Sequence, residues 1–351
     1  MSQGTGVMVT HPHVAPEWLA LRQEDILEPD QPIIDPHHHL WERSGGYFAR
    51  ELMEDLGAGH RVEATVHVQC HHGYRGAGPD ALRPVGETEF AVRMANEALA
   101  SGCRTQVCAG IVGFADLQLG AAVDEVLMAH IEAGQGRFRG VRRLSATDTA
   151  VRTHLPPLAL HLLADAAFRQ GFARLQPLGL SFDAWLFHPQ IDELASLASA
   201  FPDTAIVLDH LGTPLGVGSY RAARAEVFAA WRSAMAELAR RPNVSIKLGG
   251  LAMALVGFDF HEQPLPPASE QLAQQWRPYI ENCIELFGVD RCMFESNFPV
   301  DKGMCSYAVL WNAFKRITRG ASQREKDALF HDTAARFYRL QPVPTTNRRQ
   351  T

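Results

Sequence analysis

Short apolar runs rich in β-branched residues recur along the chain, and longer segments between them carry apolar residues three or four positions apart. The short runs are typical of buried strands, and the wider spacing is typical of helices that bury one face. Eight strands are predicted, at residues 33–36, 62–69, 106–113, 138–144, 179–187, 204–209, 243–248 and 291–296. This repeated alternation predicts an α/β fold, and we expect a single (β/α)8 TIM barrel rather than an open sheet.

The helical segments differ in how clearly the sequence marks them. Residues 270–287 carry the clearest apolar stripe, and residues 222–240 and 158–170 show the same spacing. A capping box at residues 322–325 begins a last helix, which is predicted to end near residue 338.

No internal repeat or low-complexity linker divides the chain, so we expect one main domain. The predicted organisation is an N-terminal extension over residues 1–30, the barrel over residues 31–340 and a flexible tail over residues 341–351. The longest irregular insertion, residues 252–270, follows the seventh strand. Loops of this length are usually functional, and we expect this one to overhang the end of the barrel where the strands finish.

The net charge and the cysteine pattern limit the kinds of molecule that the chain is expected to bind. The chain has 351 residues and a formal net charge of −6, with no basic block before Arg348 and Arg349, which argues against nucleic acid or an anionic membrane surface. Its six cysteines form no Cys-x-x-Cys pair. Residues 1–6 lack the charged and apolar regions typical of a signal peptide, and no run of about eighteen apolar residues occurs, so we expect no signal peptide and no membrane span. We therefore expect a reduced, cytoplasmic protein with a small-molecule substrate, and the sequence leaves open whether it forms a homo-oligomer.

The first predicted strand ends in His37, His38 and His39. Side chains alternate along a strand, so His37 and His39 point to one side and can hold one ion or one substrate atom together. Three histidines in a polar surface loop are the alternative interpretation. The apolar residues before the motif, together with Asp35, favour the strand end.

Other predicted strands also end in polar or aromatic side chains. In a barrel the catalytic groups come from these C-terminal ends, so we expect them to converge. The candidates are Gln69 and His71, Arg142 and Arg143, Trp185 and His188, His210, and Glu295 with Asn297. Only one of the two arginines can point inward. Histidines on the first, fifth and sixth strands surround one point, which predicts a metal site of His37, His39, His188 and His210.

Several motifs together resemble the amidohydrolase superfamily, and within it the lactonase branch of the amidohydrolase 2 family. The resemblance covers residues 32–340 and rests on the segments Asp35–Trp41, Val66–Gln69, Gly86–Glu89, Gly140–Arg143, Asp209–Pro214, Asn243–Leu248 and Ser296–Val300. It implies a (β/α)8 barrel that hydrolyses cyclic esters, while other relatives decarboxylate aromatic or related acids.

The resemblance also implies roles for individual residues. His37 and His39 match the first-strand metal or substrate pair, His210 matches the sixth-strand histidine, and His188 matches only loosely. Arg142 or Arg143 would hold a substrate carboxylate through its bidentate fork. The implied cofactor is a divalent metal, zinc first and manganese as the alternative, with metal-independent activity left open.

One position departs from the family pattern. Relatives usually end the eighth strand with an aspartate that serves as general base, but this chain has Asn297 there. An amide cannot act as a base near neutral pH. We expect the carboxylate to have moved to Glu295 or to Asp301, and the alternative is that Glu295 only pairs with an arginine or histidine of the barrel.

The sequence therefore predicts a metal-assisted hydrolase that opens a small lactone or a related cyclic ester or amide. Gln69, His71, Trp185, the inward arginine and the 252–270 segment are expected to position the substrate. A decarboxylase on the same barrel is the first alternative, and a non-catalytic binding protein is the second.

Overall fold

The computed structural model describes residues 11–151, 153 and 159–341. Within them, eight parallel strands form one sheet in chain order, each paired with the next. They are β1 (Pro32–His38), β2 (Arg61–Val68), β3 (Gln106–Gly113), β4 (Phe138–Leu144), β5 (Ser181–Trp185), β6 (Ile206–Leu208), β7 (Val244–Leu248) and β8 (Cys292–Phe294). The backbone N–H of His39 donates to the carbonyl of Phe298, which joins the first strand to the segment after the last. The predicted (β/α)8 barrel is confirmed.

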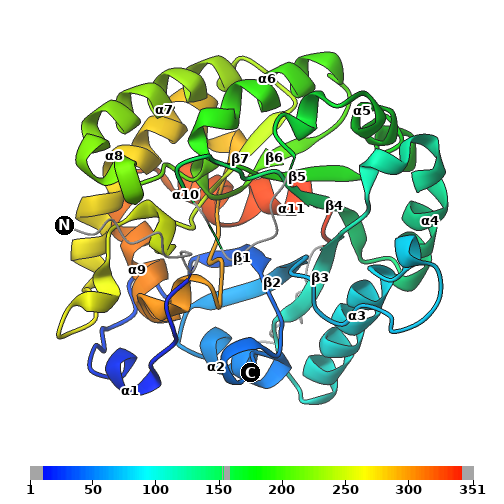
Figure 1. Ribbon diagram of the computed structural model, residues 1–351. Helices are drawn as coiled ribbons and strands as arrows, with labels where there is room; N and C mark the ends of the chain where they lie inside the picture. The colour runs from blue at the N-terminus through cyan, green and yellow to red at the C-terminus, as the bar shows by residue number, and fades with distance from the viewer. Residues whose placement is uncertain (1–10, 152, 154–158, 342–351) are drawn as a thin grey trace, which may run out of the picture.

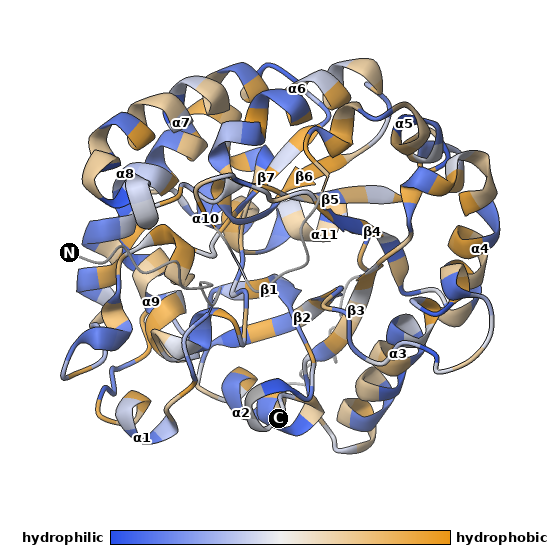
Figure 2. Ribbon diagram, viewed as in Figure 1, coloured by the Kyte–Doolittle hydropathy of each residue, from blue (hydrophilic) through white to orange (hydrophobic). Residues whose placement is uncertain are grey.

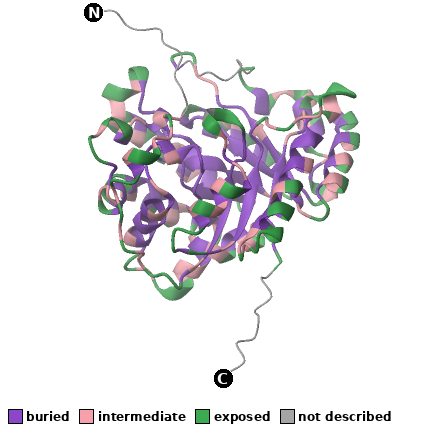
Figure 3. Cartoon of the chain, turned by 90° about the horizontal axis from the view of Figure 1, so that it is seen from below, coloured by how far each residue is buried: buried purple, intermediate pink, exposed green. Residues whose placement is uncertain are grey.

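Most of the helices form a ring outside the strands, and the last two lie behind the centre of this ring in the view of Figure 1. The described helices are α1 (Pro16–Leu19), α2 (Ala49–Leu56), α3 (Val85–Ala100), α4 (Val123–Ala133), α5 (Ala166–Phe172), α6 (Ile191–Ala200), α7 (Arg224–Ala239), α8 (Ser269–Phe287), α9 (Tyr307–Ile317), α10 (Gln323–Asp327) and α11 (Thr333–Phe337). Their hydrophilic residues gather on the outside of the ring (Figure 2), and burial is concentrated at the strands (Figure 3). None of the helices within the described ranges combines the length and apolar character needed to cross a membrane.

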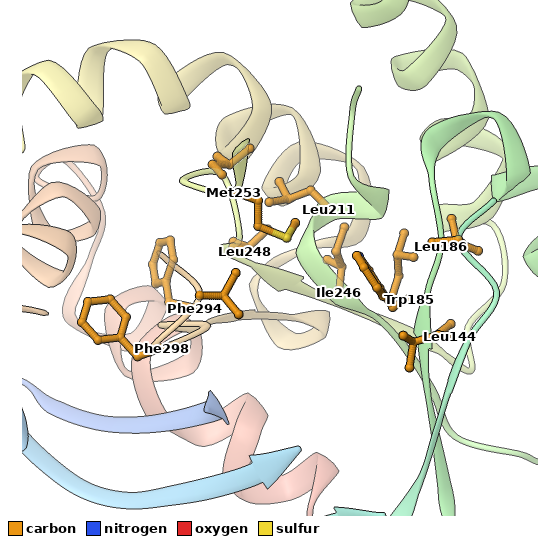
Figure 4. Packing of buried hydrophobic residues seen from close by; sticks show 14 of the residues in the cluster. Leu144, Trp185, Leu186, Leu211, Ile246, Leu248, Met253, Phe294 and Phe298 are labelled. Carbon is orange, nitrogen blue, oxygen red and sulfur yellow. The ribbon is translucent and has the colours of Figure 1, made fainter. Parts of the chain in front are cut away.

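Two apolar layers hold the barrel together. The inner one contains Val66, Val207 and Met293 from the strands, and Tyr338 after α11 packs with them. The outer one lies between the strands and the helices, where Phe294 stacks on Phe314 with ring centroids 4.5 Å apart. Figure 4 shows part of the larger buried cluster, which also includes Trp185 and Met253 near the barrel mouth. Because side chains alternate along each strand, neighbouring positions supply the two layers in turn.

The helix predictions are confirmed for the segments that became α7 and α8, and the capping box of Ser322 and Glu325 begins α10 as expected. The prediction for residues 158–170 is wrong at its start. The helix α5 begins at Ala166, because the Asp165 side chain accepts a hydrogen bond from the backbone N–H of Phe168 and caps it there. Residue 158 itself lies outside the described residues.

Two segments outside the regular barrel pack on it. In the N-terminal extension, the Trp18 indole donates to the carbonyl of Gln263, and the Leu27 N–H donates to Asn312 Oδ1. We expected the segment after β7 to overhang the barrel mouth, and only part of it does. Its residue Phe260 packs instead against Trp276 of α8, in the ring of helices. The predicted tail from residue 342 onward lies outside the described residues, and all six cysteines are free.

Candidate functional site

A layer of charged side chains lies directly above the inner apolar layer. Val207 and Met293 belong to the apolar layer, and the residues two positions further along the chain are Asp209 and Glu295. The period of two along a strand therefore places these carboxylates on the inner face, one step nearer the barrel mouth. Lys247 near the end of β7 is also fully buried.

Lys247 links the carboxylates of this layer. Its Nζ lies 2.8 Å from Asp183 Oδ2 and 3.0 Å from Asp209 Oδ1. Burial alone would lower the pKa of Lys247, but the nearby carboxylates, with Asp183 first, outweigh burial and raise it. Lys247 therefore remains a buried cation. The sequence did not lead us to predict Lys247, Asp183 or Asp209 as site residues. A lysine between two large aliphatic residues of a buried strand does, however, indicate a buried ion pair with a carboxylate.

His37 and His39 face each other as the sequence predicted, with their Nε2 atoms 3.2 Å apart. His38 points away and contacts the Thr65 hydroxyl at 2.9 Å. Burial first, and then neighbouring positive groups, hold the pKa of both His37 and His39 well below the usual range. Both rings are therefore neutral at physiological pH, and the neutral imidazole is the form that ligates metals.

Glu295 bridges two histidines from beneath. Its Oε1 lies 2.7 Å from His210 Nδ1 and accepts the backbone N–H of His210 at 3.1 Å, while Oε2 lies 2.9 Å from His37 Nδ1. Burial would raise the pKa of Glu295, but the contacts with His210 and His37 outweigh it and lower the pKa to about 2. The carboxylate is thus ionised and holds both rings in place.

Asn297 and Asp301 form a second pair at the end of the eighth strand. The Asn297 side chain donates from Nδ2 to Asp301 Oδ1 at 2.8 Å, and its own Oδ1 has no hydrogen-bond partner among the described residues. Asp301 Oδ2 accepts the backbone N–H of Ala252 at 3.2 Å. Burial raises the pKa of Asp301 well above its usual range. Asp301 is therefore a buried support for Asn297.

The contact between Asn297 and Asp301 leads us to expect that an aspartate at position 297 would destabilise this chain. We expect Asn297→Asp to lower the free energy of unfolding by about 2–3 kcal/mol at pH 8, because it replaces the donor to Asp301 with a second buried carboxylate. The folded pair would keep a proton that the unfolded chain releases, so the loss should shrink as the pH falls towards 5. Urea unfolding of both proteins at pH 8 and pH 5 measures this. An equal loss at the two pH values would contradict it.

A cavity opens above the charged layer at the end of the barrel where the strands finish. His39, His71, His210 and Asn297 line it, together with Arg142 and Trp185 from the strands, Trp41, Arg43 and Cys70 from the loops, and Met253 from the segment after β7. None of its lining residues in the described ranges is an aspartate or a glutamate. The wall is therefore rich in imidazole, aromatic and guanidinium groups.

Arg142 is the arginine that points inward. Its guanidinium donates to the Gln69 carbonyl at 2.6 Å and to Gln69 Oε1 at 3.3 Å, and Nη1 lies 3.4 Å from His37 Nε2. Arg143 instead lies over the Phe114 ring, 5.3 Å from its centroid. Strand alternation accounts for this difference. Gln69 is thus buried behind Arg142 rather than exposed in the cavity.

His188 lies apart from the other candidate ligands. Its Nδ1 accepts the backbone N–H of Leu215 at 3.3 Å, and its ring packs against Tyr220. It is in the turn after β5 rather than in the strand, and it is not among the described residues that line the cavity. Its predicted role as a metal ligand has no support from this placement.

The layer does contain donors suited to a divalent metal. His37, Asp209 and His210 each place one donor atom within 4.8 Å of the other two, and all three are buried. Neither Asp209 oxygen has a hydrogen-bond partner among the described residues, although Lys247 lies beside one of them. Two imidazoles and a carboxylate are a donor set that zinc and similar ions accept. These residues therefore fit a divalent metal.

Comparisons with known proteins identify the family of the chain. The model of the family described as Amidohydrolase (Amidohydro_2) matches residues 34–340. An uncharacterized protein, y4mH, of Sinorhizobium fredii (strain NBRC 101917 / NGR234) is 35% identical over 334 residues, which cover 89% of this chain and 99% of that protein. The L-fucono-1,5-lactonase of Burkholderia multivorans (strain ATCC 17616 / 249) is 29% identical over 334 residues, covering 90% and 98%.

Solved structures show the same barrel. The crystal structure of an amidohydrolase from Burkholderia multivorans with bound zinc is similar at a TM-score of 0.66 and 25% identity, covering 88% of this chain and 99% of that one. A probable 2-pyrone-4,6-dicarboxylic acid hydrolase from Acinetobacter baumannii shares the fold at a TM-score of 0.54 and 13% identity, covering 87% and 98%. The family match runs from the first strand to the last helix, and the chain therefore belongs to the amidohydrolase 2 family of hydrolases.

Proposed function

We propose that this protein is a metal-assisted hydrolase that opens a small lactone carrying a negative charge. The observation that carries the proposal is the buried group of His37, Asp209 and His210 at the base of a cavity. Among the described residues, the wall of this cavity holds arginines and no carboxylate. The similarity to a protein named L-fucono-1,5-lactonase supports the cyclic-ester part of the proposal.

His37, Asp209 and His210 would hold the divalent metal, with zinc the first candidate and manganese the second. An ion bound there would polarise the carbonyl group of the substrate and lower the pKa of a water. Glu295 orients both imidazoles through their Nδ1 atoms. A carboxylate behind a ligating histidine fixes the ring and raises its basicity.

Arg142 and Arg43 give the cavity its preference for an anion. Arg142 is almost fully buried, and its fork is already oriented by Gln69. Arg43 donates to the Cys70 carbonyl at 2.9 Å and lies over the Trp41 ring. A guanidinium held in this way binds a carboxylate with little loss of side-chain freedom. The indole faces of Trp41 and Trp185 would then cover the apolar face of a ring.

His39 and Asn297 are the groups that handle protons and water at the cavity wall. The Nδ1 of His39 lies 2.7 Å from the Val68 carbonyl, which fixes the proton on Nδ1 and leaves the lone pair on Nε2. We assign His39 Nε2 as the acceptor of the proton from the attacking water. It would return this proton to the ring oxygen as the ester opens. The unpartnered Oδ1 of Asn297 would hold the water through one hydrogen bond.

A panel of lactones with and without a carboxylate tests this function. We expect hydrolysis of small lactones, with the anionic members preferred. We also expect Arg142→Gln to raise KM for an anionic lactone by roughly 10- to 100-fold while changing a neutral one much less, because one charge-assisted contact is lost. Lactone hydrolysis followed by proton release measures both effects.

The control for this panel is Arg143→Gln, which removes the neighbouring guanidinium that lies over Phe114. It should leave KM close to that of the unmodified protein. Release of carbon dioxide from aromatic or unsaturated acids, with every lactone left intact, would overturn the proposal in favour of a decarboxylase. Tight binding without turnover would overturn it in favour of a binding protein.

A further inference from the structure

A second group of metal-type donors lies outside the barrel interior. It consists of His67 in β2, Cys70 in the loop that follows, and Glu87 in the first turn of α3. One donor atom from each lies within 4.8 Å of the other two. Val66 and Val68 belong to the inner apolar layer, so the residue between them faces outward, towards the helices. The group is therefore separate from the charged layer inside the barrel.

The three side chains are buried, and His67 and Glu87 have ring or carboxylate atoms without hydrogen-bond partners among the described residues. His67 is 0% exposed, Glu87 is 1% exposed and Cys70 is 5% exposed. Neither ring nitrogen of His67 has a hydrogen-bond partner among the described residues, and Glu87 Oε2 has none either. Buried polar atoms without partners cost free energy and are uncommon in folded proteins. Their convergence on one point indicates a missing partner that can bind nitrogen, oxygen and sulfur together.

Hydrogen bonds with the surrounding backbone hold these side chains in place and leave donor atoms free to bind an ion. Glu87 Oε1 accepts the backbone N–H of Cys70 at 2.7 Å and lies 3.7 Å from His67 Nε2, which leaves Oε2 free. Cys70 makes a weak contact from its thiol to the Leu40 carbonyl at 3.4 Å. The 3.7 Å between His67 Nε2 and Glu87 Oε1 is about the distance between two ligands of one tetrahedral ion at bonds of about 2.0–2.3 Å.

The chemistry of the donors selects the kind of ion. A thiolate and an imidazole favour zinc, cobalt and similar ions over calcium and magnesium, which prefer oxygen ligands. Binding would replace the thiol proton of Cys70, and that proton would leave to the solvent. Cys70 also lines the cavity, which gives an ion a route to the group from the barrel mouth.

We propose that His67, Cys70 and Glu87 form a second binding site for a zinc-like divalent ion, distinct from the group of His37, Asp209 and His210. The site would join the end of β2 to the start of α3. It would thereby fix the loop that carries Cys70 and His71 along the cavity wall.

Cobalt(II) titration of metal-depleted full-length protein tests the proposal, because a cobalt–thiolate bond gives a near-ultraviolet charge-transfer band. We expect the band in the unmodified protein and in Asp209→Asn, which impairs only the interior group. We expect Cys70→Ser to lose the band and to bind one equivalent of zinc less by elemental analysis. Cys103→Ser is the matched control, since Cys103 lies outside the group, and it should keep both signals.

A second variant keeps the proposal testable if Cys70→Ser does not fold. Glu87→Gln keeps an oxygen to accept the Cys70 N–H, and we expect it to weaken zinc binding to the site by roughly tenfold or more. No band in the unmodified protein, or a band that persists with the same zinc count in Cys70→Ser, would overturn the proposal. None of these readouts uses lactone hydrolysis, so a failure of the proposed function would leave this result unaffected.

Discussion

Exhaustive removal of divalent metal is expected to lower lactone hydrolysis by at least about 10³-fold, and added zinc or manganese should restore it. The physical reason lies in the cavity wall. Asn297 is an amide and cannot act as a base near neutral pH, and Glu295 is already engaged with His210 and His37. The proposed base, His39, has its pKa held well below the usual range, mainly by burial, so it is a weak base and needs a water whose own pKa a metal has lowered. Initial rates after dialysis against a chelator, and again after metal addition, measure the effect.

Two controls make this result specific. The Glu87→Gln variant is weakened in the second proposed site, and Glu87 is not among the described residues that line the cavity, so its relative loss and recovery of activity should follow those of the unmodified protein. Elemental analysis must show that the dialysed protein is empty. Full activity in such a protein would contradict the prediction. It would assign the chemistry to His39 and His210 without metal, which is the alternative that the sequence left open.

Glu295→Gln is expected to lower kcat/KM by about 10²-fold and to weaken metal binding by a similar factor. The amide keeps the shape of the side chain but removes the charge that holds His210 and His37. It also leaves Lys247 with one fewer nearby carboxylate. Steady-state kinetics and zinc titration of the same preparations measure the two effects.

The matched control is Asp183→Asn, which neutralises another buried carboxylate beside Lys247 without a contact to His210. We expect it to reduce thermal stability but to change kcat/KM much less than Glu295→Gln does. Equal losses in the two variants would contradict a positioning role for Glu295. They would show instead that any missing charge in the layer has the same consequence.

The barrel could be predicted because its signal is local. Each strand is a short apolar run, and each run is long enough to be recognised without knowledge of its neighbours. The pairing of His37 with His39 could be predicted for the same reason, since alternation along one strand fixes their common direction. The start of α5 could not, because the Asp165 cap competes with an apolar pattern that extends further upstream.

The choice between Glu295 and Asp301 could not be made from the sequence. Both are carboxylates close to Asn297 along the chain, but one reaches the two histidines and the other supports Asn297 from behind. The sequence did not identify Asp209 as a partner of His37 and His210. His37 comes from the first strand, far away in the chain, and simple alternation would point the neighbours Asp209 and His210 to opposite faces, whereas the backbone of His210 takes a positive φ of 54° and breaks that alternation. Distance along the chain carries no information about contacts of this kind.

The sequence by itself determined the number and order of the strands, the end of the barrel at which the polar side chains gather, and the family. These depend on periodicity and on motifs, which are properties of neighbouring residues. Only the tertiary structure decided which side chains meet. It turned Arg142 inward and Arg143 outward, and it moved His188 away from the centre. The reason is that closing the barrel brings strand ends together around one axis, and the resulting distances depend on every strand at once.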